Sequence, residues 1–435
     1  MLTSEKIIQG LNGVVEIPGD KSISHRSIII PSITNGISEI KNILKSKDVL
    51  RTINAFKLMG VKIKEKNNCL LIYGNGLHSL SKPKNKINLG NSGTSARLLI
   101  GLLSAQNFDS FLFGDRSLSN RPMDRIINPL KKMGADIGSR NNKLPIIVRG
   151  RKLKGIRYEL NIPSAQVKSG ISLAALFLED ETEIIEKNIT RNHTEIMLKS
   201  FNADIEIKKN NQINHIIIKG NKELTPKNII IPSDLSSAAF FIVGALINND
   251  SKIYMKNINI NPTRIGFLTA INRMNGQVII KNKKEVNGEI TADINVKYSK
   301  LQGCELDKNI TRLMIDEFPI LSVAASFANS PSIFKGLEEL KIKESNRLEL
   351  IRHNLLNCGV HCEVKNNNLL IDPTKRFDCK SNIIKTNMDH RIAMAFAIMG
   401  TKLGVNLTIQ DSEYINTSFP GFSNQLNSVG GCLSE

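Results

Sequence analysis

A repeat of about 72 residues is the feature that most restricts how this 435-residue chain can fold. Short polar turns, each opening an apolar stretch typical of a helix, recur along the whole chain. With residues 18, 91, 163, 232, 316 and 389 as markers, the spacings are 73, 72, 69, 84 and 73. Six returns of one pattern indicate a fold built from copies of a single supersecondary unit.

A second series of markers supports the same period. It consists of turn-forming residues that follow apolar helical stretches, namely Gly60, Gly134, Asn202, Asn275, Gly359 and Gly430. Their spacings are 74, 68, 73, 84 and 71, so both series lengthen at the same interval. Gly and Asn are the residues that most often end helices. The two series therefore mark the start and the end of elements within one repeated unit.

Each unit is predicted to run strand, helix, strand, helix, strand, strand. The first helix has small and aliphatic residues nearly all round, which is typical of a helix enclosed on every side. The second helix is amphipathic, and the closing strands flank a polar turn, as in residues 364–371. The sequence predicts an α/β fold of six βαβαββ repeats, three in each of two domains, with buried helices inside and sheets outside.

The excess of positive charge leaves two explanations open. The chain has 59 Lys and Arg against 40 Asp and Glu, a formal charge of +19. Either this is a solvated basic surface, or the chain binds an anionic partner. With no Trp and five Tyr, it has few aromatic side chains on which nucleic-acid bases could stack. The scarcity of aromatic side chains argues against a nucleic-acid partner, but charge alone does not decide between a basic surface and a small anionic substrate.

Other features exclude several classes of protein. The six cysteines contain no Cys-x-x-Cys pair, and the spacing of Cys358, His361, Cys362 and Cys379 fits no common zinc pattern, so we expect neither a metal nor a cofactor. No apolar run approaches the roughly 20 residues of a membrane span. Glu5 and Lys6 interrupt any signal-peptide pattern. A cytoplasmic protein without a membrane partner, and a monomer, is the expectation.

The polar turns have two interpretations. In a single copy, Ser, Thr, Asp or Asn at such a turn caps a helix by accepting hydrogen bonds from unpaired N–H groups. Six helix N-termini in equivalent places could also converge on anions, since each favours negative charge by about 0.3–1 kcal/mol. Cations stand beside the turns, for example Lys21 and Arg26. Lys343 and Arg347, at positions i and i+4, are expected on one helix face.

The motifs resemble those of the 3-phosphoshikimate 1-carboxyvinyltransferases, also called 5-enolpyruvylshikimate-3-phosphate synthases, within the enolpyruvyl transferase family. The similar segments are residues 21–26 (KSISHR), 89–97 (LGNSGTSAR), 120–123 (NRPM), 164–169 (SAQVKS), 190–194 (TRNHT), 261–264 (NPTR), 316–319 (DEFP), 343–347 (KESNR) and 389–392 (DHRI). The resemblance implies a two-domain inside-out α/β barrel. One domain would span residues 18–232, the other residues 1–17 and 233–435, with the active site in the cleft between them.

The implied reaction moves the enolpyruvyl group of phosphoenolpyruvate to the 5-hydroxyl of shikimate 3-phosphate, through a tetrahedral intermediate and with release of phosphate. By resemblance, the residues that bind shikimate 3-phosphate are Lys21, Ser22, Arg26, Ser164, Ala165, Gln166, Arg191, Asp316 and Lys343. Those that bind phosphoenolpyruvate are Lys21, Gly93, Arg121, Gln166, Arg347 and Arg391, with Thr94 and His390 nearby. Asp316 and Glu344 are the candidate proton-transfer groups, with Lys21 tuning both through its charge.

Two further points concern the resemblance. Many relatives have a Lys where this chain has Thr417-Ser418 before Phe419-Pro420, so one cation used on phosphoenolpyruvate is missing. Gly93 is the small residue at a position linked in this family to glyphosate access, which predicts sensitivity to that inhibitor. The UDP-N-acetylglucosamine enolpyruvyl transferases are the nearest alternative, but they rely on a loop cysteine that none of the six cysteines here matches.

Overall fold

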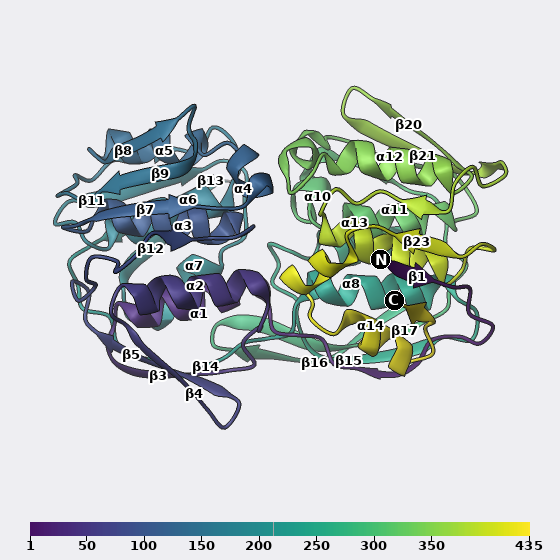
Figure 1. Ribbon diagram of the computed structural model, residues 1–435, viewed down its shortest axis with the longest axis horizontal. Helices are drawn as coiled ribbons and strands as arrows, with labels where there is room; N and C mark the ends of the chain where they lie inside the picture. Colours follow the sequence, from purple (N-terminus) through teal and green to yellow (C-terminus); the bar gives the residue numbers. More distant parts are fainter. Residues whose placement is uncertain (212) are drawn as a thin grey trace. The chain divides into compact units, whose positions relative to one another are not determined.

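The computed structural model describes residues 1–211 and 213–435 and divides into two compact units (Figure 1). Unit 1 comprises Met1–Pro18, Pro232–Glu285 and Ile290–Glu435, and unit 2 comprises Gly19–Ile231 and Val286–Glu289. Each unit has its own hydrophobic core. Val286–Glu289 is the tip of a hairpin whose remaining residues belong to unit 1, a crossing that the repeat pattern does not predict.

The predicted two helices are present in every repeat, and two short helices (Arg116–Asn120 and Lys308–Arg312) and two 3-10 helices are additional. Those of unit 2 are α1 (Lys21–Ser32), α2 (Lys47–Leu58), α3 (Gly93–Ser104), α4 (Arg116–Asn120), α5 (Asp124–Lys132), α6 (Ala165–Ala175) and α7 (His193–Ser200). Those of unit 1 are α8 (Leu235–Ile247), α9 (Gly266–Arg273), α10 (Lys308–Arg312), α11 (Phe318–Ser326), α12 (Arg347–Asn357), α13 (His390–Gly400) and α14 (Phe422–Ser428), with 3-10 helices η1 (Glu338–Ile342) and η2 (Ser412–Thr417).

Short strands separate these helices. In unit 2 they are β3 (Asn35–Lys41), β4 (Lys62–Lys66), β5 (Cys69–Asn75), β6 (Ile87–Asn88), β7 (Asp109–Phe113), β8 (Asp136–Arg140), β9 (Lys143–Arg149), β10 (Arg157–Glu159), β11 (Glu181–Glu186), β12 (Asp204–Asn210), β13 (Ile213–Lys219) and β14 (Ile229–Ile230). In unit 1 they are β1 (Leu2–Ser4), β2 (Asn12–Val15), β15 (Lys252–Asn259), β16 (Val278–Val286), β17 (Glu289–Lys297), β18 (Glu305–Leu306), β19 (Ser332–Phe334), β20 (Val360–Lys365), β21 (Asn368–Arg376), β22 (Ile383–Ile384), β23 (Leu407–Ile409) and β24 (Leu433–Ser434), the tip of β16–β17 excepted.

The described strands form six four-stranded sheets of one topology. In the order β6-β7-β9-β8, for example, a short edge strand pairs parallel to its neighbour and the other pairs are antiparallel. The same order recurs in β10-β11-β13-β12 and in β18-β19-β21-β20. The predicted α/β fold of βαβαββ repeats is confirmed.

The first, fourth and sixth repeats each include a strand from a distant part of the chain. β14 pairs with β3 of the first repeat, and β2 pairs with β15 of the fourth. In the sixth repeat, the N-terminal strand β1 lies between β23 and β24 and takes the place that β21 has in the fifth. The chain termini therefore lie near each other within unit 1 (Figure 1).

The second series of sequence markers coincides with the ends of helices. Its six members follow the last turns of α2, α5, α7, α9, α12 and α14, and all six have positive φ angles between 61° and 102°. Gly adopts this left-handed conformation without a steric penalty and Asn tolerates it. The periodic Gly and Asn residues are thus explained by backbone geometry at helix ends.

The first helix of most repeats lies in a core, as its all-round apolar pattern predicts. Every residue of α8 is buried, and in unit 1 α8, α11 and α13 pack against one another. In unit 2, α3 packs against α6. Among residues 1–211 and 213–435, no helix has both the length and the apolar composition required to cross a bilayer.

Candidate functional site

The predicted site residues fall into two groups, one in each unit. Lys21, Ser22, Arg26, Gly93, Thr94, Arg121, Ser164, Ala165, Gln166 and Arg191 belong to unit 2. Asp316, Lys343, Glu344, Arg347, His390 and Arg391 belong to unit 1. Most members of the unit 2 group, and Arg347, His390 and Arg391 of the unit 1 group, lie at the starts of helices. The backbone N–H groups there are unpaired and favour anions.

Helix α1 begins with two of the predicted cations. Asp20 caps it, accepting a 2.9 Å hydrogen bond from the N–H of Ile23. The Lys21 Nζ lies 2.5 Å from Asp48 Oδ2, so its first partner is a carboxylate of α2. One turn later, Arg26 is 3% exposed. This turn therefore both caps the helix, through Asp20, and places the cations Lys21 and Arg26 near its start.

Three hydrogen bonds orient the buried guanidinium of Arg26. Its nitrogens donate to Thr194 Oγ1 (2.6 Å), Ser169 Oγ (2.7 Å) and the carbonyl of Ser22 (2.9 Å). Burial lowers the pKa of Arg26 to about 10, against the opposing charge of Glu195, so the group stays charged at neutral pH. A guanidinium held in this way is preorganised for bidentate contact with a phosphate or carboxylate.

His25 lies next to these cations and is completely buried. Its Nδ1 is 2.8 Å from Thr52 Oγ1. Burial, helped by the charges of Lys21 and Arg26, lowers the pKa of His25 well below its ordinary value. The neutral imidazole is therefore the native form.

This shift predicts a pH dependence of stability. Because the unfolded chain protonates His25 at about pH 6.5 and the folded chain does so only at lower pH, stability is full above about 6.5. It falls as the pH decreases from there toward the folded pKa, by up to about 1.4 kcal/mol per pH unit. Thermal unfolding at pH 7.5 and 5.5 should show a larger loss of Tm for the unchanged protein than for His25→Gln. Equal losses in both proteins would contradict this expectation.

A buried ion cluster supports the loop that contains Arg191. Lys168 of α6 is completely buried, and its Nζ lies 2.6 Å from Glu195 Oε1 and 2.9 Å from Glu186 Oε1. Glu186 also accepts hydrogen bonds from the N–H and hydroxyl of Thr190, the residue before Arg191. Burial lowers the pKa of Lys168, but the two carboxylates more than offset this and the pKa is raised.

The start of α3 brings Gly93 close to two guanidinium groups. A Cβ built on Gly93 would lie 2.9 Å from Nη1 of both Arg121 and Arg97. Arg121 is nearly buried, and its Nη2 donates to Asn91 Oδ1 at 2.5 Å. Glycine at this position therefore leaves room beside two cations.

Gln166 joins α6 to α3. Its Nε2 donates to Thr94 Oγ1 at 3.0 Å, and its Oε1 accepts from Arg97 Nη1 at 2.9 Å. Ser164 caps α6 through a 3.4 Å bond from the N–H of Val167. The structure thus places Thr94 and Gln166 in direct contact.

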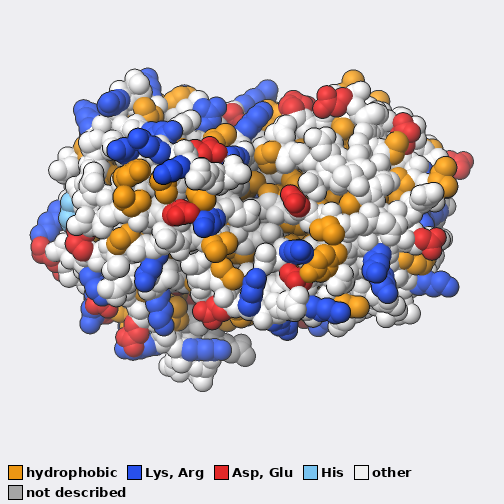
Figure 2. Space-filling view, turned by 90° about the horizontal axis from the view of Figure 1, so that it is seen from below, with side chains coloured by type: hydrophobic (Ala, Val, Ile, Leu, Met, Phe, Trp, Pro, Cys, Tyr) orange, Lys and Arg blue, Asp and Glu red, His pale blue; other side chains and the backbone are white. Residues whose placement is uncertain are grey.

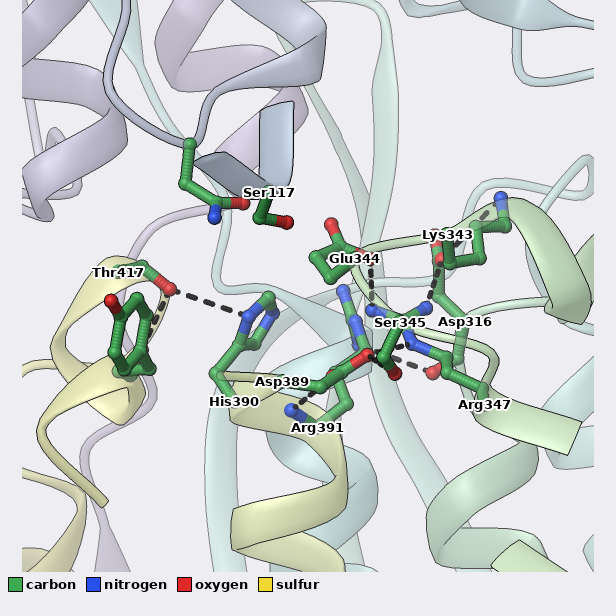
Figure 3. Close-up of polar contacts among 12 residues, drawn as sticks. Ser117, Asp316, Lys343, Glu344, Ser345, Arg347, Asp389, His390, Arg391 and Thr417 are labelled. Carbon is green, nitrogen blue, oxygen red and sulfur yellow. Dashed lines mark hydrogen bonds and ion pairs between the residues drawn. The ribbon is translucent and has the colours of Figure 1, made fainter. Parts of the chain in front are cut away.

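In unit 1, Arg347 is the centre of a cluster of carboxylates (Figure 3). Its side chain is 1% exposed, and its nitrogens contact Glu344 Oε2 at 2.5 Å, Asp389 Oδ2 at 2.8 Å and Asp316 Oδ1 at 3.2 Å. Burial lowers the pKa of Arg347, but Asp389, Glu344 and Asp316 outweigh it and the pKa is raised. Both candidate proton-transfer carboxylates, Asp316 and Glu344, therefore contact one buried cation.

Lys343 and Arg391 complete this cluster. Lys343 Nζ is 3.9 Å from Asp316 Oδ1, and burial lowers the pKa of Lys343 against the opposing charge of Asp316. Arg391 Nη1 donates to the backbone carbonyl of Asp316 at 3.4 Å. The expectation that Lys343 and Arg347 share a helix face is wrong, because α12 begins at Arg347 and Lys343 follows the 3-10 helix η1.

The segment that lacks the Lys of many relatives contacts His390. Thr417 Oγ1 is 3.3 Å from His390 Nδ1 and donates to the carbonyl of Tyr414 at 2.7 Å (Figure 3). Thr417 is nearly buried. The position is therefore filled by a short hydroxyl side chain that bonds within unit 1.

Sequence reasoning missed the residues that hold the predicted ones in place. Ser169 and Thr194 orient Arg26, Asn91 bonds Arg121, and Asp389 bonds Arg347. All four lie within the segments that resemble the family, but a polar side chain alone does not reveal which cation it contacts. Within the described part of the chain, no group of three or more His, Cys, Asp or Glu residues could hold a metal ion.

Comparisons with known proteins show the family of the chain. A family model described as EPSP synthase (3-phosphoshikimate 1-carboxyvinyltransferase) matches residues 6–426. A 3-phosphoshikimate 1-carboxyvinyltransferase of Ruthia magnifica subsp. Calyptogena magnifica is 43% identical over 426 residues, covering 98% of this chain and 97% of the relative. One from Thermoanaerobacter sp. (strain X514) is 43% identical over 413 residues, covering 95% and 96%.

Solved structures show the same similarity. EPSP synthase from Acinetobacter baumannii superimposes with a TM-score of 0.86 at 39% identity, covering 100% of this chain and 99% of the other. The enolpyruvyl transferase NikO from Streptomyces tendae, at 13% identity and a TM-score of 0.77, shares the fold. The predicted enolpyruvyl transferase activity of the shikimate pathway is confirmed, and the chain belongs to the EPSP synthase (3-phosphoshikimate 1-carboxyvinyltransferase) family.

Proposed function

We propose that residues of both units bind the two anionic substrates, shikimate 3-phosphate and phosphoenolpyruvate. The phosphate and hydroxyl groups of shikimate 3-phosphate are assigned to Lys21, Ser22, Arg26, Ser164, Ala165, Gln166, Arg191, Asp316 and Lys343. Phosphoenolpyruvate is assigned to Lys21, Gly93, Arg121, Gln166, Arg347 and Arg391, with Thr94 and His390 beside it. A site in the cleft between the domains stays a prediction.

Electrostatics gives the reason for so many cations. Each pair of close negative charges on the two substrates costs about 4 kcal/mol at an effective dielectric constant near 20. Arg26 and Arg347 are already buried and oriented, so neither needs to be reordered when an anion arrives. This preorganisation favours binding of both substrates at once.

In the proposed mechanism Asp316 accepts the proton of the attacking 5-hydroxyl, and Glu344 supplies the proton to the methylene carbon of phosphoenolpyruvate. Oxygen then adds to the carbon that bears the phosphate, which gives a tetrahedral intermediate. Loss of phosphate and of a methyl proton forms the enolpyruvyl ether. The observation that supports this assignment is that one buried guanidinium, Arg347, contacts both carboxylates and so fixes their separation.

The decisive assay measures phosphate release from phosphoenolpyruvate. We expect release with shikimate 3-phosphate present and none without it. UDP-N-acetylglucosamine should not replace shikimate 3-phosphate as acceptor. Activity with the UDP-sugar alone would contradict the acceptor assignment.

Replacing Gly93 by Ala should weaken phosphoenolpyruvate binding. The new methyl group would lie 2.9 Å from Nη1 of Arg121 and of Arg97, so both guanidinium groups must move. We expect the KM for phosphoenolpyruvate to rise about tenfold, which is about 1.4 kcal/mol, with a smaller change in the KM for shikimate 3-phosphate. Gly404→Ala is the control, because among the described residues no atom other than those of Gly404 and its two chain neighbours lies within 4 Å of the added carbon. An unchanged KM in Gly93→Ala would contradict the assignment.

Glyphosate should inhibit the unchanged enzyme by competing with phosphoenolpyruvate, and inhibit Gly93→Ala less. The reason is the same space beside Arg121 and Arg97 that the added methyl group would occupy. Inhibition constants measured at several phosphoenolpyruvate concentrations test this. Noncompetitive or absent inhibition of the unchanged enzyme would contradict the expectation.

We further propose a cytoplasmic monomer whose substrates are small molecules and not nucleic acid. Multiply charged phosphorylated substrates do not cross membranes unaided, which favours the compartment where they are made. On the face seen in Figure 2, Lys and Arg side chains lie at many separate places with Asp and Glu among them. Light scattering tests the oligomeric state, and a salt titration of DNA binding tests the exclusion of nucleic acid.

A further inference from the structure

Arg264 has the same place in its repeat as three arginines assigned to substrates. It lies just before α9, the second helix of the fourth repeat, as Arg121 and Arg191 lie before α5 and α7 and Arg347 opens α12. The intervals between these four arginines are 70, 73 and 83 residues, which follow the repeat. The mechanism above gives Arg264 no role.

The side chain of Arg264 is directed into unit 1 and is 3% exposed. Its Nη2 donates to Asp234 Oδ1 at 3.0 Å and to Ser236 Oγ at 2.7 Å. Asp234 caps α8 by accepting a 2.8 Å bond from the N–H of Ser236. Arg264 is thus hydrogen-bonded to two residues at the start of α8.

Ser236 extends this chain of contacts to the start of α11. Its hydroxyl donates to Glu317 Oε1. Glu317 is 2% exposed and makes no side-chain hydrogen bond that caps its own helix. Its Oε2 is buried without a hydrogen-bond partner among the described residues. A buried carboxylate with so few donors costs free energy, so a simple capping role does not explain it.

Glu317 is the neighbour of Asp316, and the two side chains have different surroundings. The side chain of Asp316 is 17% exposed and contacts Arg347 and Lys343. Adjacent Cα atoms are about 3.8 Å apart, so anchoring Glu317 restricts where Asp316 can lie. Two contacts thus restrict the position of Asp316. Arg347 binds its carboxylate directly, and Ser236 bonds the side chain of the adjacent residue, Glu317.

We propose that Arg264 and Glu317 are positioning residues for enolpyruvyl transfer, which act through Ser236 to hold the Asp316 carboxylate where it meets the attacking hydroxyl. This inference rests on the proposed role of Asp316. Arg264 and Arg347 then have parallel tasks. Arg347 links the first helix of its repeat to the first helix of the next by direct bonds, and Arg264 does so through Ser236.

Ser236→Ala tests the proposal because it removes one hydroxyl from the middle of the chain of contacts. We expect kcat to fall about tenfold, since small displacements of a reacting group are costly, with both KM values within about twofold. Ser322→Ala is the matched control. Ser322 is also buried in a helix of unit 1, and its hydroxyl donates to the carbonyl of Phe318 without contacting Asp316. Its kcat should stay within about twofold of the unchanged enzyme.

A double-mutant cycle with Asp316→Asn separates positioning from general stability. In the Asp316→Asn background, Ser236→Ala should lower the residual kcat by less than about twofold, because the group to be positioned is already gone. If Ser236→Ala has a normal kcat while Asp316→Asn is impaired, the positioning inference is overturned but the proposed role of Asp316 is not. A tenfold loss that recurs in both backgrounds also overturns it. A normal kcat in Asp316→Asn overturns the role of Asp316 and the inference with it.

Arg264→Lys and Glu317→Gln serve as second variants if Ser236→Ala does not fold. Lys keeps the charge but not the planar group that contacts Asp234 and Ser236 together, and Gln keeps the shape of Glu317 without its charge. Each should lower kcat with little change in KM, and their losses should likewise disappear in the Asp316→Asn background. Losses that persist there contradict the proposal.

Discussion

Replacing Asp316 by Ala is expected to lower kcat by about 10²–10³-fold while changing the KM of each substrate far less. In the proposed mechanism the carboxylate accepts a proton that leaves the attacking hydroxyl only as the new bond forms. Its loss therefore affects the transition state more than the bound substrates. Steady-state kinetics with both substrates varied provides the measurement.

Asp307→Ala is the control for this experiment. Asp307 belongs to the same unit, is exposed, and caps α10 through bonds from the N–H groups of Asn309 and Ile310. Its removal should leave kcat within about twofold. Near-normal turnover in Asp316→Ala would remove Asp316 from the mechanism. If Glu344→Gln lowers kcat strongly and Asp316→Ala does not, both proton transfers would be assigned to Glu344.

Replacing Lys168 by Met is expected to destabilise unit 2 by about 3–5 kcal/mol. The ammonium is completely buried between Glu186 and Glu195, and removing it leaves two carboxylates without their cation. Denaturant unfolding followed by a probe in unit 2 measures the loss. The loop with Thr190 and Arg191 should loosen as well, since Glu186 bonds Thr190.

Two further variants show whether the unpaired charges cause this loss. The triple variant Lys168→Met, Glu186→Gln, Glu195→Gln has neutral groups of similar size and should regain most of the stability. Lys152→Met removes one partner of an exposed pair with Glu179 and should change stability by less than about 1 kcal/mol. A Lys168→Met protein as stable as the Lys152→Met protein would contradict the expectation.

The repeats could be predicted because their signals are local. Gly60 and Asn202 adopt left-handed conformations at helix ends, and few other residues do so without cost. The apolar composition of α8 required burial wherever it packed. Such requirements act within a few residues, so they are visible in the order of the amino acids.

The pairing of strands between different repeats was much harder to predict. β1 completes the sheet of the sixth repeat, and β2 and β14 pair with strands of repeats other than their own. A strand of two to four residues carries almost no information about its partner. The pairing depends on how each unit packs as a whole, which brings together strands that are distant in the sequence.

Only the structure shows which of the positive charges behind the net charge of +19 are buried and which are exposed. Arg26, Lys168, Arg264 and Arg347 are buried and paired, whereas Lys152 is one of many exposed cations. Burial removes water that would otherwise solvate the charge, so a buried cation must have partners in fixed positions. Buried cations of this kind can therefore orient other groups.

By itself, the sequence determined the six βαβαββ repeats, the family and the residues that stand at the starts of the helices. The tertiary structure alone decided what each cation contacts. Arg264 and Arg347 occupy equivalent places in the repeat, yet Arg347 contacts Asp316 directly, whereas Arg264 bonds Ser236, which in turn bonds Glu317. The reason is that hydrogen bonds act over about 3 Å, and only packing brings residues distant in the chain within that range.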